Sequence, residues 1–194
     1  ALSQLDRVLV IGSFLRKDHP LFAQRIRQAA RRGAQVHSLH AVHDDWLLPL
    51  TTRMTAAPSG WAGALAEIAA AVAVAKGIAP PVAASAGTVA QAVAASLLSG
   101  ERKALLLGNA AAQHPQASAL LALATWIAQA CGATVGYLGD AANTVGAQLV
   151  GALPGPNGLS AAQMLSQPMK ALLLLDVDPV LDAADASAAA TALK

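Results

Sequence analysis

The sequence predicts an α/β protein, folded as a three-layer αβα sandwich around a mainly parallel sheet. Short apolar runs rich in Val, Ile and Leu alternate with longer stretches whose apolar residues recur at helical spacing. One pattern occurs twice, at Val8–Pro20 and Leu105–Pro115: an apolar run, a glycine, a polar loop and His-Pro before a helical stretch. The fold is therefore expected to be built from two similar βαβ units, residues 7–40 and 103–138.

The first unit begins with Arg7–Gly12, a short apolar run that fits a strand buried on both faces. Pro20 suits the first helical position, where its missing N–H costs nothing, and Leu21–Arg32 then shows an apolar stripe at helical spacing. Gly33 can supply the left-handed residue that ends such a helix. Ala34–Leu39 is therefore expected as the second strand.

The region between the two units is expected to be mainly helical. Trp46–Met54 is predicted as a loop or short helix, because Pro49 prevents regular continuation. Trp61–Ala75 and Val89–Leu98 have mostly apolar helical patterns, which indicates that each helix has contacts on more than one side. Glycine and proline within residues 77–81 separate these two helices.

The second unit repeats the order of the first. Lys103–Gly108 is predicted as a strand, Gln116–Ala130 as a helix and Ala133–Leu138 as a strand. The glycines, prolines and asparagines of residues 139–158 indicate a long irregular crossing, with one helical turn at 145–149.

The last part of the chain is expected to hold a short helix, a strand and a loose tail. Ser160 can cap a helix that ends at Ser166. Lys170–Leu175 is predicted as a strand, and the alanine-rich tail from Asp185 is expected to fray. Residues 1–194 are interpreted as a single α/β domain.

Composition narrows the classes of function. The single cysteine, Cys131, excludes a disulfide framework and any cysteine-based iron–sulfur or zinc site built from this chain alone. Glycine and proline interrupt the apolar stretch Ile68–Gly100, so no direct membrane insertion is expected. Net charge is only +2, and the basic first unit offers only Phe14 and Phe22 for stacking, so nucleic acid is not an expected partner.

One segment has a metal-like composition: His37, His40 and His43, followed by Asp44 and Asp45. Imidazoles and carboxylates together can bind zinc or a similar ion. The first part of the segment lies in a predicted strand, however, where a spacing of three puts successive side chains on opposite faces. A structural or solvated role is therefore expected, with no metal site.

Candidate binding residues lie where the predicted strands end. Sheets of this Rossmann-like kind bind ligands at the carboxyl ends of their strands, which is where Gly12-Ser13 and Gly108-Asn109 fall. The two glycines permit close backbone approach, but neither loop has the spacing of a dinucleotide fingerprint or a P-loop. The simpler interpretation is that the glycines let strand turn into helix, and that His19 and His114 cap or pack at the helix starts.

Several segments together resemble a known family. They are Val-Leu-Val-Ile-Gly-Ser-Phe-Leu-Arg-Lys-Asp-His-Pro-Leu, Arg-Arg-Gly-Ala-Gln-Val, Asp-Asp-Trp-Leu-Leu-Pro, Leu-Leu-Leu-Gly-Asn-Ala-Ala-Ala-Gln-His-Pro-Gln-Ala, Ala-Asn-Thr-Val-Gly-Ala and Lys-Ala-Leu-Leu-Leu-Leu. This combination, from about Val8 to Asp182, resembles the carboxy-terminal region of the large subunit of bacterial NADH:quinone oxidoreductase, respiratory complex I. That region is itself similar to the molybdopterin oxidoreductase superfamily.

The resemblance implies that residues 1–194 are a fragment of a larger subunit of an enzyme that passes electrons from NADH to quinone, which also fits a first residue, Ala1, other than methionine. The leading hypothesis is that the fragment is a structural, cofactor-free domain of that subunit. The resemblance also implies that iron–sulfur clusters are held in the amino-terminal part of the intact subunit. The implied partners are this amino-terminal part and other subunits of the peripheral arm. The implied location is the cytoplasmic face of the bacterial inner membrane. Active relatives have an asparagine after the glycine and serine of the first loop, where this chain has Phe14. Gly12, Ser13, Gly108 and Asn109 are thus expected as a vestigial pocket, with no catalytic residue.

Two alternatives remain open at this point. The chain could be a fragment of an active molybdopterin oxidoreductase that binds a pterin guanine dinucleotide in the crevice, with Asn109, Asp176 and Asp178 as cofactor contacts. It could instead be an independent Rossmann-type nucleotide-binding enzyme, which would depend on Asp140 after the closing strand of the second unit.

Overall fold

The computed structural model describes residues 1–139, 143–167 and 169–194. By contacts between its residues the chain divides into two compact units, Ala1–Asp140 and Ala141–Lys194. The expectation of one domain over residues 1–194 stays a prediction.

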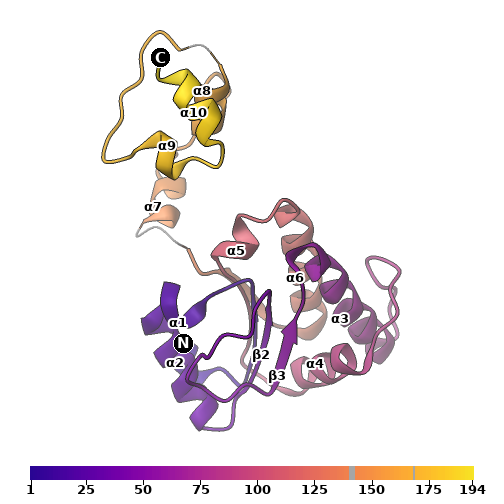
Figure 1. Cartoon of the computed structure of the whole chain (residues 1–194). Coiled ribbons are helices and arrows are strands. Elements are labelled where there is room, and N and C mark those ends of the chain that lie inside the picture. Colours follow the sequence, from indigo (N-terminus) through magenta and orange to yellow (C-terminus); the bar gives the residue numbers. More distant parts are fainter. Residues whose placement is uncertain (140–142, 168) are drawn as a thin grey trace. The chain divides into compact units, whose positions relative to one another are not determined.

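The sheet of unit 1 is all parallel. Within the described residues it has five strands in the order β3-β2-β1-β4-β5 (Figure 1). These strands are β1 (Arg7–Ile11), β2 (Gln35–His40), β3 (Thr52–Thr55), β4 (Lys103–Leu107) and β5 (Thr134–Tyr137). The central strands β1 and β4 are almost wholly buried, as expected for parallel strands covered on both faces.

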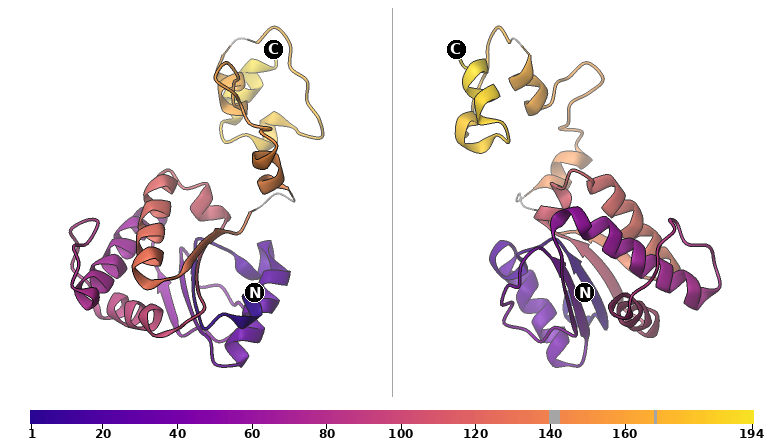
Figure 2. Two further views of the ribbon diagram at one scale, coloured as in Figure 1. Left: turned by 180° about the vertical axis from the view of Figure 1, so that it is seen from behind. Right: turned by 45° about the vertical axis from the view of Figure 1, so that its right-hand side comes forward.

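Helices cover both faces of this sheet, as Figure 2 shows. On one face, α3 (Trp61–Lys76), α4 (Thr88–Ser99) and α6 (Ala117–Cys131) pack on Leu9, Ile11, Leu105 and Leu107. On the other, α1 (Leu15–Asp18) and α2 (Pro20–Arg31) cover Val8 and Val10. The alternation of Val8 and Val10 with Leu9 and Ile11 follows the two-residue period of a strand. This three-layer arrangement confirms the predicted α/β sandwich.

Helix α3 is apolar on nearly every side because it lies between two other helices, α4 and α6. Among the described helices, the stretch Pro58–Lys76, which adds the short 3-10 turn Pro58–Gly60, is the one long and apolar enough to cross a membrane by length and composition. Half of its most apolar window is buried inside the protein. A core helix passes the same test, and α3 is a core helix of unit 1.

Unit 2 contains four short helices within its described residues: α7 (Thr144–Leu149), α8 (Ala161–Ser166), α9 (Pro179–Asp182) and α10 (Ala186–Ala192). Ser160 caps α8 as predicted, and its side chain forms a capping box with Gln163. The carboxylates of Asp178 and Asp185 cap α9 and α10 in the same way. The predicted turn at 145–149 is confirmed as α7.

Three sequence-based expectations were wrong. Residues 52–55, predicted as loop or short helix, form the edge strand β3, because Pro49 precedes the strand and does not interrupt it. Lys170–Leu175 forms no strand: Leu173 and Leu175 are 98% and 88% exposed, and the described part of unit 2 contains no strand to pair with. The tail does not fray at its start, since Asp185 caps α10 and Ala189 is buried.

Candidate functional site

The two glycine loops lie side by side at the carboxyl edge of the sheet. Strands β1 and β4 are neighbours, with Ile11 opposite Leu107, and the Gly108 N–H donates to the Ile11 carbonyl at 2.8 Å. The structure therefore brings together the four predicted residues Gly12, Ser13, Gly108 and Asn109. Strand order reverses between β1 and β4, which is the point where open α/β sheets bind their ligands.

Two amide donors of the second loop are already engaged by the protein's own backbone. After β4 the short helix α5 (Asn109–Ala112) begins, and its Ala110 and Ala111 N–H groups donate to the Gly12 carbonyl at 3.0 and 3.3 Å. Free amides at such a helix start are what binds phosphate in nucleotide sites. Here the first loop accepts these hydrogen bonds.

The two glycines are required by this close contact between the loops. Gly12 has φ +58°, and a Cβ there would lie 2.7 Å from both the Ala111 nitrogen and Trp61 Cζ3. A Cβ on Gly108 would overlap Ser13. The contact fits the interpretation that the glycines let strand turn into helix, because it needs backbone without side chains at both positions.

A row of four rings covers the same edge. The Phe14 and His40 rings meet edge to face at 4.4 Å between centroids, and His40 lies 6.0 Å from Trp61, which stacks on His114 at 5.6 Å. Trp61 is 1% exposed, and its indole N–H donates to the Ala56 carbonyl at 3.0 Å. These rings come from four separate segments, and we call them the aromatic row.

Two buried polar atoms at this edge lack a hydrogen-bond partner among the described residues, the Ser13 hydroxyl and His40 Nε2. The Ser13 side chain is buried, and its hydroxyl has no hydrogen-bond partner among the described residues. Buried hydroxyls normally have a partner, so this atom is a site where a water or a ligand atom would be favourable. Asn109, the other polar candidate, is half-buried at the start of α5.

The two histidines of the repeated His-Pro pattern hold loops together. The His19 Nε2–H donates to the Gly139 carbonyl at 2.8 Å. The His114 Nε2–H donates to the Pro58 carbonyl at 3.0 Å, while its Nδ1 accepts from the Gln116 N–H at 2.9 Å. Both nitrogens of His114 thus bind backbone groups, which leaves this ring no lone pair for general-base work. The packing role expected for these two residues agrees with this geometry.

The metal-like segment does not converge on one point. His37 Nε2–H donates to Ser96 Oγ at 2.7 Å, and Ser96 in turn donates to Gln35 Oε1 at 2.5 Å. His40 belongs to the aromatic row, and His43 is exposed beside Arg53. Across residues 1–139, 143–167 and 169–194 no group of three or more His, Cys, Asp or Glu side chains is placed to hold a metal ion.

Burial of β2 histidines makes stability depend on pH. Burial lowers the pKa of His37 to about 4, with a smaller contribution from Arg7, and burial also lowers the pKa of His40. Because the folded pKa of His37 lies below the unfolded value of 6.5, the unfolded state takes up the proton first. The contribution of His37 to the free energy of unfolding is fully present above pH 6.5. It is lost as pH falls toward 4, by about 3 kcal/mol in all.

We expect His37→Gln to reduce this loss. Urea unfolding at about pH 7.5 and about pH 4.5 should show a fall in the free energy of unfolding that is smaller in His37→Gln than in the wild type by about 2 kcal/mol. His43→Gln, which changes an exposed histidine, is the matched control and should lose as much as the wild type. Equal losses in all three proteins would contradict the assignment.

The remaining candidates belong to unit 2 or to residues outside the described ranges. Asp176 and Asp178 are exposed residues of unit 2, where Asp178 Oδ1 accepts from the Val180 N–H at 3.0 Å as a helix cap. Asp140, on which the nucleotide-enzyme alternative depends, lies outside the described residues.

A comparison with known proteins identifies the family of this chain. A family model described as molybdopterin oxidoreductase matches residues 2–194. The chain belongs to the molybdopterin oxidoreductase family. A search of curated proteins returned no match. The match confirms the expected similarity to molybdopterin oxidoreductases, which are a family of oxidoreductases.

For this molybdopterin oxidoreductase family chain, sequence reasoning missed most of the residues that shape the edge. Trp61 and His40 lie far from both glycine loops in sequence, and the role of the Ala110 and Ala111 amides depends on which carbonyl faces them. One signal was present: with only three tryptophans in the chain, Trp61 directly after Pro-Ser-Gly at a helix start is conspicuous.

Proposed function

We propose that this chain is a structural, cofactor-free domain of the molybdopterin oxidoreductase family, in which the protein itself fills the ancestral binding edge. The single observation that carries the proposal is the aromatic row over Gly12, with Trp61 in contact with that glycine. The residues present do not fit a pterin guanine dinucleotide, since the Gly12 carbonyl takes the α5 amides and Trp61 covers the backbone that a phosphate would approach.

The second part of the proposal concerns the enzyme complex to which this domain belongs. The sequence segments quoted above resemble the large subunit of complex I, so the domain would brace the cluster-bearing amino-terminal part of that subunit and contact other peripheral-arm subunits. Its location would be the cytoplasmic face of the bacterial inner membrane. The enzyme reaction, from NADH to quinone, would belong to the holoenzyme, and the iron–sulfur clusters to the amino-terminal part.

The rival function is an active molybdopterin oxidoreductase fragment, and the observation that favours it is the buried, unpartnered Ser13 hydroxyl. Cofactor content separates the two. The protein is produced in cells that make molybdenum cofactor, alongside a molybdoenzyme as positive control, and both are assayed for molybdenum and for extracted pterin by mass spectrometry. We expect neither in the chain. Stoichiometric molybdenum and pterin would refute the proposed function.

The complex I assignment has a separate test. An affinity tag on the intact subunit in its own cells should co-purify NADH:quinone oxidoreductase activity and iron–sulfur clusters from the membrane fraction. Recovery of the tagged subunit without either would contradict the assignment, and would leave the cofactor-free proposal standing.

A further inference from the structure

The outer face of α2 carries positive charge and no negative charge. Its buried side, formed by Ala23, Ile26, Ala29 and Ala30, packs on the sheet. Besides Pro20 and Phe22, which are also exposed, the outer side of the helix contains Leu21, Gln24, Arg25, Arg27, Gln28, Arg31 and, just after its end, Arg32. We call these seven residues the arginine face. At a rise of 1.5 Å per residue, the twelve-residue helix presents it over about 18 Å.

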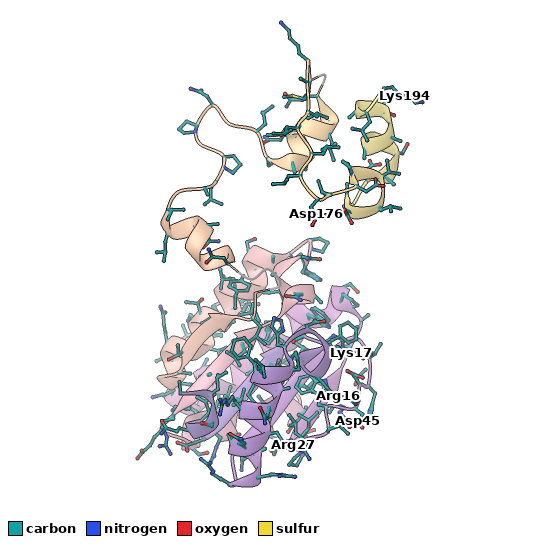
Figure 3. The ribbon with its side chains drawn as sticks, turned by 90° about the vertical axis from the view of Figure 1, so that its left-hand side faces the viewer. Arg16, Lys17, Arg27, Asp45, Asp176 and Lys194 are labelled. Carbon is teal, nitrogen blue, oxygen red and sulfur yellow. The ribbon has the colours of Figure 1, made fainter. Side chains whose placement is uncertain are left out.

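Three of the four arginines of this face are not used by the fold; the fourth, Arg32, donates from Nη1 to the Ser3 carbonyl at 3.5 Å. Arg25, Arg27 and Arg31 are exposed and have no hydrogen bond or ion pair with the residues the structure describes. Figure 3, which looks at the side of unit 1 formed by α1 and α2, labels Arg27 of α2 together with Arg16 and Asp45. By contrast, Arg16 and Lys17 of α1 each have a carboxylate, Asp45 and Asp44, at 3.9 Å.

A merely solvated helix face is a poor explanation for this pattern. Solvated faces gain stability from opposite charges three or four residues apart, and α2 contains no acidic residue at all. Arg27 and Arg31 are instead a like-charge pair at a spacing of four, which disfavours the isolated helix. Arg31 and Arg32 can compensate the negative end of the helix dipole, but Arg25 and Arg27 are too far from that end.

The residue types indicate a protein partner. Every cation on the face is an arginine, which binds carboxylates in a bidentate manner and is enriched in protein interfaces, where lysine is depleted. Leu21 is 74% exposed and adds an apolar contact one turn from Arg25. Asp44 and Asp45 lie beside α1, where a continuous nucleic-acid backbone or a flat anionic membrane would meet negative charge.

We propose that the arginine face of α2 is a docking surface for an acidic protein surface, whose carboxylates pair with Arg25, Arg27 and Arg31 around an apolar contact to Leu21. The proposal rests on the proposed role of the chain as a domain that contacts neighbouring subunits, and it names the chemistry of one neighbour. The arginine face lies outside the glycine loops, so the docking proposal can fail while the cofactor-free proposal holds, and the reverse.

The test measures binding of defined probes to the whole chain. The probes are a fluorescein-labelled peptide rich in Glu and Asp with one leucine per helical turn, a labelled DNA duplex of random sequence, and vesicles containing phosphatidylserine. The variant R25Q/R27Q/R31Q removes three charges from the face. The control K76Q/K170Q/K194Q removes three charges from exposed lysines elsewhere and so has the same net charge. Circular dichroism checks that both remain folded.

We expect the peptide to bind the wild type and the lysine control alike, and the arginine variant at least about tenfold more weakly, with the difference vanishing at high salt. Absence of peptide binding to the wild type overturns the proposal. So does an equal loss in both variants, which would show an effect of net charge alone. Tighter binding of DNA or vesicles than of peptide, lost in the arginine variant, would overturn it in favour of those partners.

Discussion

Replacing Trp61 with alanine is expected to lower the free energy of unfolding by about 3–5 kcal/mol. The side chain is fully buried, lies in the cluster that includes Leu9 and Ile11, and is the centre of the aromatic row. Its removal would leave a cavity over the Gly12 loop and an unpaired Ala56 carbonyl. Urea unfolding followed by circular dichroism measures the loss without relying on tryptophan fluorescence.

Trp126→Ala is the matched control for this substitution. Trp126 lies on the neighbouring helix α6 and is only half-buried, so the same change of residue should cost clearly less stability there. If both variants lost the same amount, or if Trp61→Ala cost less than about 1 kcal/mol, Trp61 would not be the residue that closes the edge.

The second large effect is expected at Gly12. Gly12→Ala should lower the free energy of unfolding by about 2–4 kcal/mol, because two costs add. The first is the left-handed backbone, with φ +58°, that a residue with a Cβ adopts unwillingly. The second is overlap, since the new Cβ would lie 2.7 Å from the Ala111 nitrogen and from Trp61 Cζ3.

Gly132→Ala separates these two costs. Gly132 ends α6 with φ +69°, nearly the conformation of Gly12, and a Cβ there meets nothing within 4 Å. The control therefore carries the backbone cost alone, about 1 kcal/mol. An excess of about 1–3 kcal/mol for Gly12→Ala measures the contact between the two loops. No excess would mean that the loops can separate freely, and that the edge can open to a ligand.

The central strands could be predicted from the sequence because burial on both faces requires apolar residues at nearly every position. Arg7–Ile11 and Lys103–Leu107 are apolar at nearly every position and end on glycine, and few other structures produce that pattern. The edge strand Thr52–Thr55 could not be predicted in this way. Its residues are half-exposed or exposed and mostly polar, so its conformation follows from pairing with β2 rather than from its own composition.

For Lys170–Leu175 the error was the opposite one, because a strand was predicted where none forms. Its leucines have the composition of a central strand, but composition states only that a segment can pair and be covered, not that a neighbour is available. The described part of unit 2 offers no strand, and among its described residues only Pro179 and Ala189 are buried. The leucines therefore remain exposed.

The candidate site was predicted in outline. Glycine at the end of two buried strands placed Gly12 and Gly108 at one edge, because neighbouring parallel strands end together. What closes the edge could not be predicted. Trp61 reaches Gly12 only because α3 packs across β1, and His40 reaches Phe14 only because β2 ends beside the first loop. Those contacts are properties of the packed chain.

The central claim is that the protein's own side chains occupy the edge where relatives would hold a nucleotide. The most direct test is to follow the backbone amide resonances of Gly12, Gly108 and Ala111 by NMR while guanosine monophosphate is added to about 10 mM. We expect that these resonances do not move in a saturable way, and that the indole N–H of Trp61 stays protected from solvent exchange. Saturable shifts confined to these amides would show an open nucleotide site and contradict the account.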